Sequence, residues 1–207
     1  MILTYHGGQC FKLSRGDTTI AFDPPAKQGA DWPPVKFGAD VVLSSMHHPN
    51  FAGYDQMKLG GREPFVIHGP GEYEVGELTV QGFGVQTQYQ GVDRYNTIYY
   101  VQFDQMNILF LGALGDPELD SKILGALSDI DLLFVPIGGG DVLEVPQASK
   151  LAVKLEARAV IPMHYDKTAL QAFLKEEGTD AKPQEKYTLK KKDVAVMEGE
   201  VLVLQSK

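Results

Sequence analysis

The sequence has very little cysteine, since Cys10 is the only one among 207 residues. A single thiol excludes an intramolecular disulfide and any zinc site built from several cysteines. Chains without disulfides are typical of reducing compartments, so we expect a cytoplasmic protein. There is also no run of about 18 apolar residues. Met1–Tyr5 has the pattern of a strand rather than of a signal peptide, and we therefore expect no membrane association.

Basic residues are also few. Lys and Arg total 19 against 27 Asp and Glu, which gives a net charge of −8. An acidic surface repels phosphate backbones, so nucleic acid is not expected as a partner. The only basic run, at residues 190–192, is predicted to be a solvated turn. A small molecule or another protein is the expected partner, and an oligomer is compatible with the sequence.

Short apolar segments separated by turn residues predict a strand-rich first half. The chain contains 22 Gly and 12 Pro, spread between the segments as turn formers. Asp104-Gln105 is predicted to join two of the strands in a hairpin. The expected strands of this half are Ile2–Tyr5, Cys10–Leu13, Thr18–Phe22, Val41–Ser44, Pro64–Ile67, Glu77–Val80, Asn96–Phe103 and Met106–Leu111.

Three segments of the second half carry apolar residues at helical spacing. One helix is expected to begin at Asp116-Pro117, a second spans Val145–Glu156, and a third spans Lys167–Glu177 with Gly178 at its end. The expected strands of this half are Leu132–Val135, Val160–Met163, Tyr187–Leu189 and Glu200–Leu204. This order of strands and helices predicts one α/β domain over residues 1–207, with two sheets inside and helices outside.

The five histidines are the natural candidates for metal ligands in a chain without a cysteine cluster. His47 and His48 follow one predicted strand and His164 follows another, and loops at strand ends are common places for functional sites. No His-x-His or His-x-x-x-His spacing occurs, so each histidine is equally compatible with a polar loop role. The roles of His6 and His68 stay open at this point.

Two further motifs admit a chemical and a structural interpretation. Glu72 and Glu74 point to the same side of an extended segment, where they could act as acid and base or hold a cation, but an exposed strand explains them more simply. The Gly138–Gly140 run allows close approach of a ligand or a sharp turn, and it lacks the residues of a phosphate loop. Cys10 has no base partner in the sequence and is not expected to be a nucleophile.

Taken together, several blocks resemble the metallo-β-lactamase superfamily, in particular its Zn-dependent-hydrolase-like or lactonase-like branch in prokaryotes. The blocks follow the family order over nearly the whole chain, and the last one is the most specific. They are residues 4–11 with 20–24, residues 39–45, the Gly-Pro-Gly-Glu-Tyr-Glu segment 69–74, residues 110–115, and residues 135–139 with 160–165. The resemblance implies a four-layer αββα sandwich with mixed sheets and a site at one edge.

The resemblance also implies seven metal-ligand positions, a His-x-His-x-Asp-His run plus a later His, an Asp and a final His. In this sequence those positions hold Met46, His48, Asn50, Phe51, Phe110, Ala113 and His164. Only His48 and His164 are retained. The other five side chains are poor ligands or have no ligand atom, and Asn50 cannot accept a proton as a carboxylate base does.

Two functions are therefore compatible with the sequence. The first is a member of this family with a degenerate metal site, no standard dinuclear zinc hydrolysis and a binding or regulatory role, with no cofactor and no assignable catalytic residue. The alternative is a metal-dependent hydrolase of an ester, a lactone or a phosphodiester. It would use one ion such as zinc at His48 and His164, joined by His47, His6 or Glu72. A purely structural oligomerisation unit is a third reading.

Overall fold

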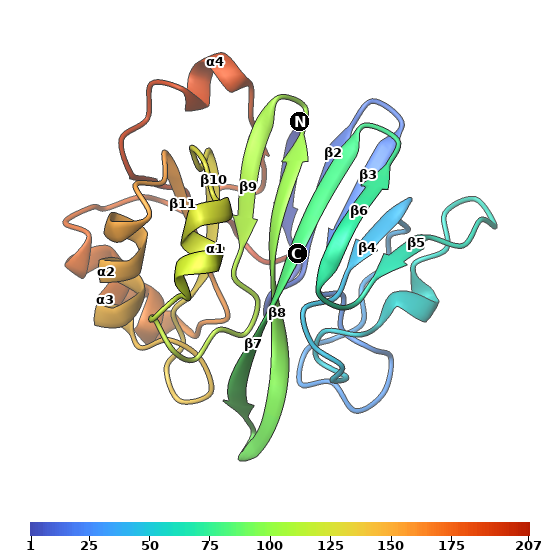
Figure 1. The fold of residues 1–207 in the computed structure, drawn as a ribbon, viewed down its shortest axis with the longest axis horizontal. Coiled ribbons are helices and arrows are strands. Elements are labelled where there is room, and N and C mark those ends of the chain that lie inside the picture. Colours follow the sequence, from blue (N-terminus) through green and yellow to red (C-terminus); the bar gives the residue numbers. More distant parts are fainter.

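Two β-sheets face each other in the computed structural model, which describes residues 1–207 (Figure 1). Along the first sheet, the strand order is β12 (Tyr187–Thr188), β1 (Ile2–Tyr5), β2 (Phe11–Arg15), β3 (Thr18–Phe22), β4 (Val41–Leu43) and β5 (Phe65–Ile67). Along the second sheet, it is β13 (Glu200–Val201), β11 (Ala159–Met163), β10 (Leu132–Pro136), β9 (Met106–Phe110), β8 (Val92–Phe103), β7 (Leu78–Tyr89) and β6 (Gly71–Val75).

Both sheets are mixed. Strands β3, β4 and β5 are parallel, as are β9, β10, β11 and β13, and the remaining neighbours are antiparallel. Parallel neighbours need crossover connections, so their carboxyl ends lie at the same edge of a sheet. The loops after β4, β9, β10 and β11 therefore meet at one edge of the molecule, which we call the loop edge.

The space between the sheets holds the main core of 27 buried residues. Phe22, Phe110 and Phe134 form an aromatic group at its centre, with ring centroids 4.9, 5.7 and 5.8 Å apart. Burying one such side chain contributes about 1.5–3 kcal/mol. Strand β10 is buried along its whole length because it faces this core on one side and helices on the other.

Helices cover the outer face of the second sheet, as predicted for an αββα sandwich. These are α1 (Ser121–Ala126), α2 (Val145–Lys154) and α3 (Lys167–Glu176), and they pack in a second cluster of 18 buried residues. The outer face of the first sheet is covered instead by a long loop with the 3-10 helix η1 (Tyr54–Gln56). The four-layer prediction is confirmed, with one outer layer reduced to these irregular segments (Figure 1).

The start of α1 was predicted wrongly. Asp116 accepts a hydrogen bond from the backbone N–H of Glu118, which closes a turn instead of capping a helix. The helix begins at Ser121, and Asp120 is its N-cap, with its carboxylate accepting from the Lys122 backbone at 2.7 Å. The other two helices begin where the sequence predicts, and Gly178 follows α3 with φ 63°, as a helix-ending glycine does.

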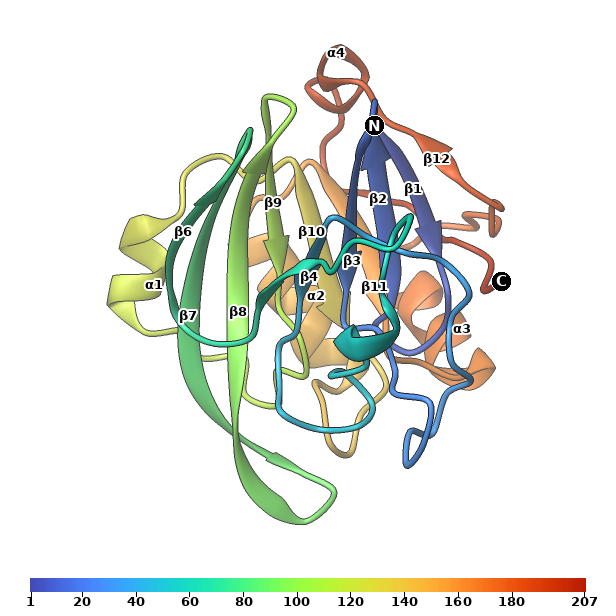
Figure 2. The same ribbon diagram turned by 90° about the vertical axis from the view of Figure 1, so that its right-hand side faces the viewer.

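Strands β7 and β8 are much longer than predicted. Each has 12 residues, and they pair continuously up to Tyr89 and Val92. Gln90 and Gly91 form the tip with φ 51° and 71°, as a two-residue hairpin turn requires. Figure 2 shows the two strands continuing past the rest of the second sheet, so the tip of the hairpin reaches the loop edge.

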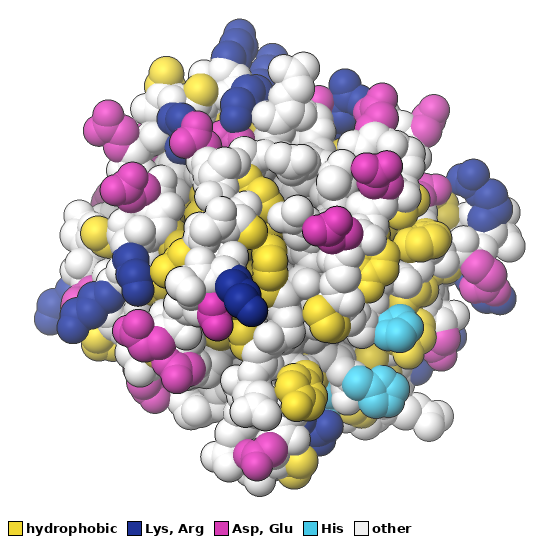
Figure 3. Space-filling model, viewed as in Figure 1, with side chains coloured by type: hydrophobic (Ala, Val, Ile, Leu, Met, Phe, Trp, Pro, Cys, Tyr) yellow, Lys and Arg dark blue, Asp and Glu magenta, His cyan; other side chains and the backbone are white.

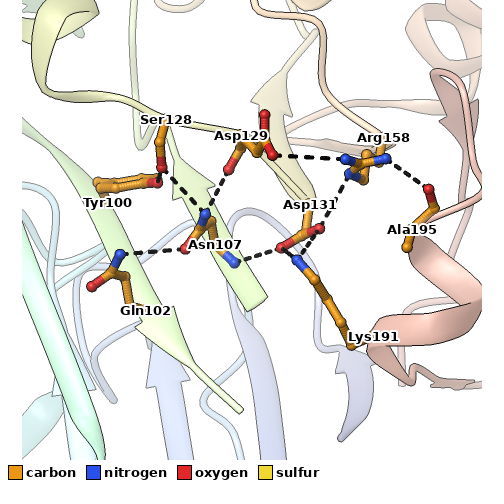
Figure 4. A network of polar contacts seen from close by, with 9 residues as sticks. All are labelled: Tyr100, Gln102, Asn107, Ser128, Asp129, Asp131, Arg158, Lys191 and Ala195. Carbon is orange, nitrogen blue, oxygen red and sulfur yellow. Dashed lines mark hydrogen bonds and ion pairs between the residues drawn. The ribbon is translucent and has the colours of Figure 1, made fainter. Parts of the chain in front are cut away.

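The basic run at residues 190–192 is not only a solvated turn. Lys191 begins the short helix α4 (Lys191–Val194), and its Nζ lies 2.8 and 2.6 Å from the carboxylate oxygens of Asp131 (Figure 4). Asp131 is fully buried just before β10 and also accepts from the Asn107 backbone N–H at 2.8 Å. Arg158 approaches the same carboxylate at 3.5 Å. The network fixes α4 to the edge of the second sheet opposite the loop edge.

No helix of the protein combines the length and the apolar composition that crossing a membrane requires.

Candidate functional site

A buried carboxylate anchors the loop after β4. Asp23 is 0% exposed and accepts hydrogen bonds from the backbone N–H and the hydroxyl of Ser45, at 2.6 and 2.7 Å. Burial raises the pKa of Asp23 to about 8, although the two hydrogen bonds from Ser45 act in the opposite direction. The Ser45 carbonyl in turn accepts from Thr97 of β8. These contacts fix the start of the segment that carries Met46, His48, Asn50 and Phe51.

Five of the seven positions implied by the family resemblance lie together at the loop edge. Met46, Phe51 and Ala113 belong to one buried apolar cluster, and the rings of His48 and His164 lie 6.0 and 6.2 Å from that of Phe51. Phe110 lies elsewhere, in the core between the sheets. Phe110 thus lies apart from the apolar cluster at the loop edge. Asn50, the remaining position, lies next to the cluster through Tyr89.

Both retained histidines are held by hydrogen bonds at Nδ1. His48 is 8% exposed, and its Nδ1 accepts from the backbone N–H of Asn50 at 3.2 Å. Because a backbone N–H can only donate, neutral His48 carries its proton on Nε2. The Nδ1 atom of His164 lies 2.7 Å from the side-chain nitrogen of Gln9. A metal-binding histidine usually donates its second N–H to an acceptor, and the His48 contact has the opposite polarity.

Burial favours the neutral form of both imidazoles. It lowers the pKa of His164 to about 4, and it also lowers the pKa of His48, where the nearby Arg94 guanidinium acts in the same direction. His164 has φ 52°, a left-handed conformation that few residues other than glycine adopt. Its backbone N–H donates to the Gly8 carbonyl at 2.6 Å, which connects the loop edge of the second sheet to the first sheet.

Tyr89 occupies the space between the two histidines. Its ring lies 5.1 Å from that of His48 and 5.9 Å from that of His164, edge to face in both cases. Tyr89 is 2% exposed and packs with Met46, Phe51, Ala113 and Val142, and Trp32 closes the group from the solvent side. The centre of the loop edge is therefore filled by aromatic and aliphatic side chains.

A polar layer lies over this apolar cluster. Asn50 donates from its amide to the Tyr89 hydroxyl at 2.8 Å and to the Asp31 carboxylate at 2.7 Å, and its amide oxygen accepts from the Asp31 backbone at 2.7 Å. Gln90 donates to the same carboxylate at 2.9 Å. The hydrogen-bonding atoms of Asn50 are thus already used, and burial raises the pKa of Tyr89 to about 12, so its phenol stays protonated.

The residues at this centre do not fit the metal pair that the family implies. No group of three or more His, Cys, Asp or Glu side chains lies close enough together to hold an ion. The Tyr89 and Phe51 rings each lie against both His48 and His164, so the surroundings of the two imidazoles are aromatic and apolar, which does not suit a hydrated dication. The amide of Asn50 is engaged by Asp31 and Tyr89. We derive no chemical step through a metal from this arrangement.

The other predicted ligand candidates lie apart from this centre. His6 packs against Phe37 with the two ring planes tilted by 38° and their centroids 4.6 Å apart, and burial lowers the pKa of His6 to about 4. His47 and His68 are exposed, and histidine side chains are visible at the surface over the loops that follow β4 and β5 (Figure 3). Glu72 is exposed on β6. No hydrogen bond or ring contact joins the side chains of His6, His47, His68 or Glu72 to those of His48 or His164.

The remaining motifs have structural explanations. Glu74 lies beside Glu72 on the exposed face of β6, as the simpler of the two interpretations predicts. A Cβ on Gly138 would lie 2.1 Å from the His164 carbonyl oxygen, so glycine is needed there for close backbone packing. Cys10 is fully buried just before β2, and burial raises the pKa of its thiol, which fits its expected inertness.

Sequence reasoning missed the residues that fill the centre. Tyr89 and Trp32 come from segments far from the retained histidines, and no local pattern assigns them to a site. Trp32 is the only tryptophan of the chain, which is the one signal that could have drawn attention to it. A Cβ on Gly8 would lie 2.6 Å from the Trp32 ring, so the Gly7-Gly8 pair provides the space for the indole.

Comparisons with known proteins agree with the fold. A family model described as "Beta-lactamase superfamily domain" matches residues 2–164. The chain is 27% identical over 197 residues to a UPF0173 metal-dependent hydrolase of Bacillus licheniformis, covering 80% of this chain and 85% of that protein. It is 28% identical over 197 residues to a UPF0173 metal-dependent hydrolase of Listeria monocytogenes, covering 80% and 86%.

Solved structures give the same answer. A metallo-beta-lactamase superfamily protein of Thermotoga maritima superimposes with a TM-score of 0.76 at 27% identity, over 99% of this chain and 98% of the other. The match of the family model over most of the chain and this superposition agree with the four-layer sandwich. The chain belongs to the beta-lactamase superfamily, with the metallo-β-lactamase fold, and it is related to the UPF0173 metal-dependent hydrolases.

Proposed function

We propose that this chain is a single-domain member of its superfamily that binds a small molecule at the loop edge and no longer forms a dinuclear zinc centre. The observation that carries the proposal is the packing of Tyr89 between His48 and His164. A buried aromatic ring with a hydrogen-bonded hydroxyl is stable in this place, whereas a hydrated dication needs charged or lone-pair ligands on several sides.

Space for a small molecule exists beside the packed centre. A hollow of about 500 Å³ lies next to His164 and Trp32. A cavity of about 600 Å³ lies beside the hairpin that β7 and β8 form, which we call the hairpin side. Gly140 and Asp141 line both, so the loop after β10 separates them. Volumes of this size are typical of pockets for small molecules.

A second candidate function is supported by the comparisons. The relatives named above are called metal-dependent hydrolases, and they match most of this chain. The corresponding proposal is hydrolysis of an ester, a lactone or a phosphodiester with a single ion at His48 and His164. It requires movement of Tyr89 and a change of the His48 tautomer, because Nε2 carries the proton in the present hydrogen-bond arrangement.

Metal content separates the two functions. The full chain, untagged and purified without chelator, is analysed by elemental mass spectrometry before and after incubation with Zn²⁺ and removal of the excess. The His48→Ala/His164→Ala variant is the matched control. We expect the same amount of zinc, near zero, in both proteins. About one zinc per chain in the wild type, lost in the double variant, would overturn the binding proposal and support the hydrolase.

A further inference from the structure

Arg94 is exceptional among the four arginines of the chain. Arg15, Arg62 and Arg158 each form ion pairs with carboxylates. Arg94 forms neither an ion pair nor a hydrogen bond, and its Nε is buried without a partner. An unpaired buried donor costs free energy, and a guanidinium is shaped to pair with a carboxylate through two parallel hydrogen bonds. Arg94 therefore has donors available for a bound group.

The surroundings of Arg94 form the cavity of about 600 Å³ on the hairpin side. Arg94 pairs in register with Thr87, so the two side chains share one face of the hairpin. Thr87 donates to the Ala113 carbonyl at 3.4 Å, which turns this face toward the loop after β9. Of the ten residues that line the cavity only Tyr95 is hydrophobic, so its occupant must be a polar molecule.

Carboxylates from two other segments also line this cavity. Asp116 follows β9 and Asp141 follows β10, whereas Arg94 belongs to β8. Backbone N–H groups hold both carboxylates in place. Glu118 donates to Asp116 at 2.9 Å and Gln90 donates to Asp141 at 3.0 Å. Each of these hydrogen bonds uses one carboxylate oxygen, and the other oxygen remains available.

The separation of these charges determines which ligands fit. One guanidinium and three carboxylates, including Asp93, line the cavity, and Arg94 pairs with none of them. A simple anion would meet an excess of negative charge, and a simple cation would leave Arg94 without a partner. A molecule with one carboxylate and one ammonium group pairs with both the guanidinium and the carboxylates.

We propose that the cavity binds a small zwitterion, with its carboxylate on the Arg94 guanidinium and its ammonium group against Asp116 and Asp141. The volume exceeds that of one amino acid and suits a dipeptide-sized molecule. The inference rests on the proposed function, because it names the class of small molecule that the loop edge takes. It assigns no reaction to the bound molecule.

The experiment uses three probes that differ only in charge. L-alanyl-L-alanine, its C-terminal amide and its N-acetyl derivative are titrated into the full chain, and binding is followed by calorimetry and by NMR of the protein. We expect the free dipeptide to bind with a Kd of about 1 mM or tighter, and each blocked form to bind at least about tenfold more weakly.

Variants test the role of Arg94. We expect Arg94→Gln to weaken dipeptide binding at least about tenfold and Arg94→Lys to weaken it less, because lysine keeps the charge but not the planar pair of donors. Arg62→Gln, at an exposed ion pair far from the cavity, is the matched control and should bind as the wild type does. Thermal unfolding of each variant shows whether it is folded.

Three results would overturn the inference: no saturation by the free dipeptide, equal binding of the amide, or unchanged binding in the Arg94→Gln variant. The zinc measurement decides the proposed function independently. Zinc-loaded protein that still binds the dipeptide through Arg94 would refute only the absence of a metal centre. Zinc-free protein that binds none of the three probes would refute only the proposal that the cavity binds a zwitterion.

Discussion

Replacing Tyr89 by alanine tests whether the centre of the loop edge is packed in solution. The substitution removes a ring that is 2% exposed and lies 5.2 Å from Phe51 and 5.1 Å from His48. Truncating a buried aromatic residue to alanine costs about 3–5 kcal/mol. We expect the lower end, about 3 kcal/mol, because the hairpin tip is at the edge of the molecule and its neighbours can partly close the gap.

A second substitution at the same position separates packing from hydrogen bonding. Tyr89→Phe keeps the ring and removes only the hydroxyl that accepts from Asn50, which still has Asp31 as a partner. The expected cost is about 1 kcal/mol. For a chain of this length, 1 kcal/mol lowers Tm by about 2–4 °C, so the two variants should melt about 6–12 °C and about 2–4 °C below the wild type.

The assay is thermal unfolding together with urea unfolding at constant pH, with the m-value checked for two-state behaviour. Tyr95→Ala is the matched control, since this tyrosine is 70% exposed on the neighbouring strand and its loss should cost no more than about 0.5 kcal/mol. A cost below about 1 kcal/mol for Tyr89→Ala would refute the reasoning. It would mean that the hairpin tip is open in solution and that His48 and His164 are accessible.

Three further substitutions test other parts of the structure. Asp131→Ala should cost about 2–3 kcal/mol in urea unfolding, less than a fully buried ion pair, because its Lys191 partner is 40% exposed and can turn to solvent. Costs of Asp131→Ala and Lys191→Met that simply add in the double variant would argue against a shared network. The pKa of Asp23 rises from an ordinary value of 3.8 to about 8 on folding, so the folded state binds the extra proton and stability falls as pH rises between these values. Asp23→Asn should flatten that dependence between pH 5 and pH 8, and parallel curves for both proteins would contradict it. Gly8→Ala should destabilise the protein by about 2 kcal/mol and shift the fluorescence of Trp32, because the new methyl group would lie 2.6 Å from the indole ring. Gly16→Ala is the control, since Gly16 has a similar positive φ in open space; it should cost about 1 kcal/mol and leave the Trp32 fluorescence unchanged.

The strands were predictable where β-branched and apolar residues make a short continuous run. Ile2–Tyr5 and Thr18–Phe22 have the predicted bounds, and nearly all of their residues are buried, as in strands covered on both faces. The hairpin was predicted too short because β7 alternates exposed residues such as Gln86 and Gln88 with half-buried ones. Its stability comes from pairing with β8 rather than from burial. Local patterns do not contain that pairing.

The candidate site was predictable only in part, for a related reason. The positions of His48 and His164 follow from strand ends, and the structure brings them to the same edge. Tyr89 and Trp32 join them from a hairpin tip and a long loop, which no spacing in the sequence connects. Lys191 shows the same limit, since a run of three lysines is normally solvated, and only the tertiary structure places a buried carboxylate against one of them.

The two retained histidines have roles here that need no metal. His164 adopts φ 52°, a conformation in which histidine, asparagine and aspartate are enriched among residues other than glycine, and its backbone N–H bonds to Gly8 of the opposite sheet. His48 accepts the Asn50 backbone N–H and so closes the turn that places the Asn50 amide against the Tyr89 hydroxyl. Each imidazole stabilises a loop whose other side chains fill the centre. Retention of both histidines is therefore compatible with the binding proposal, and a family resemblance at these two positions does not by itself favour hydrolysis.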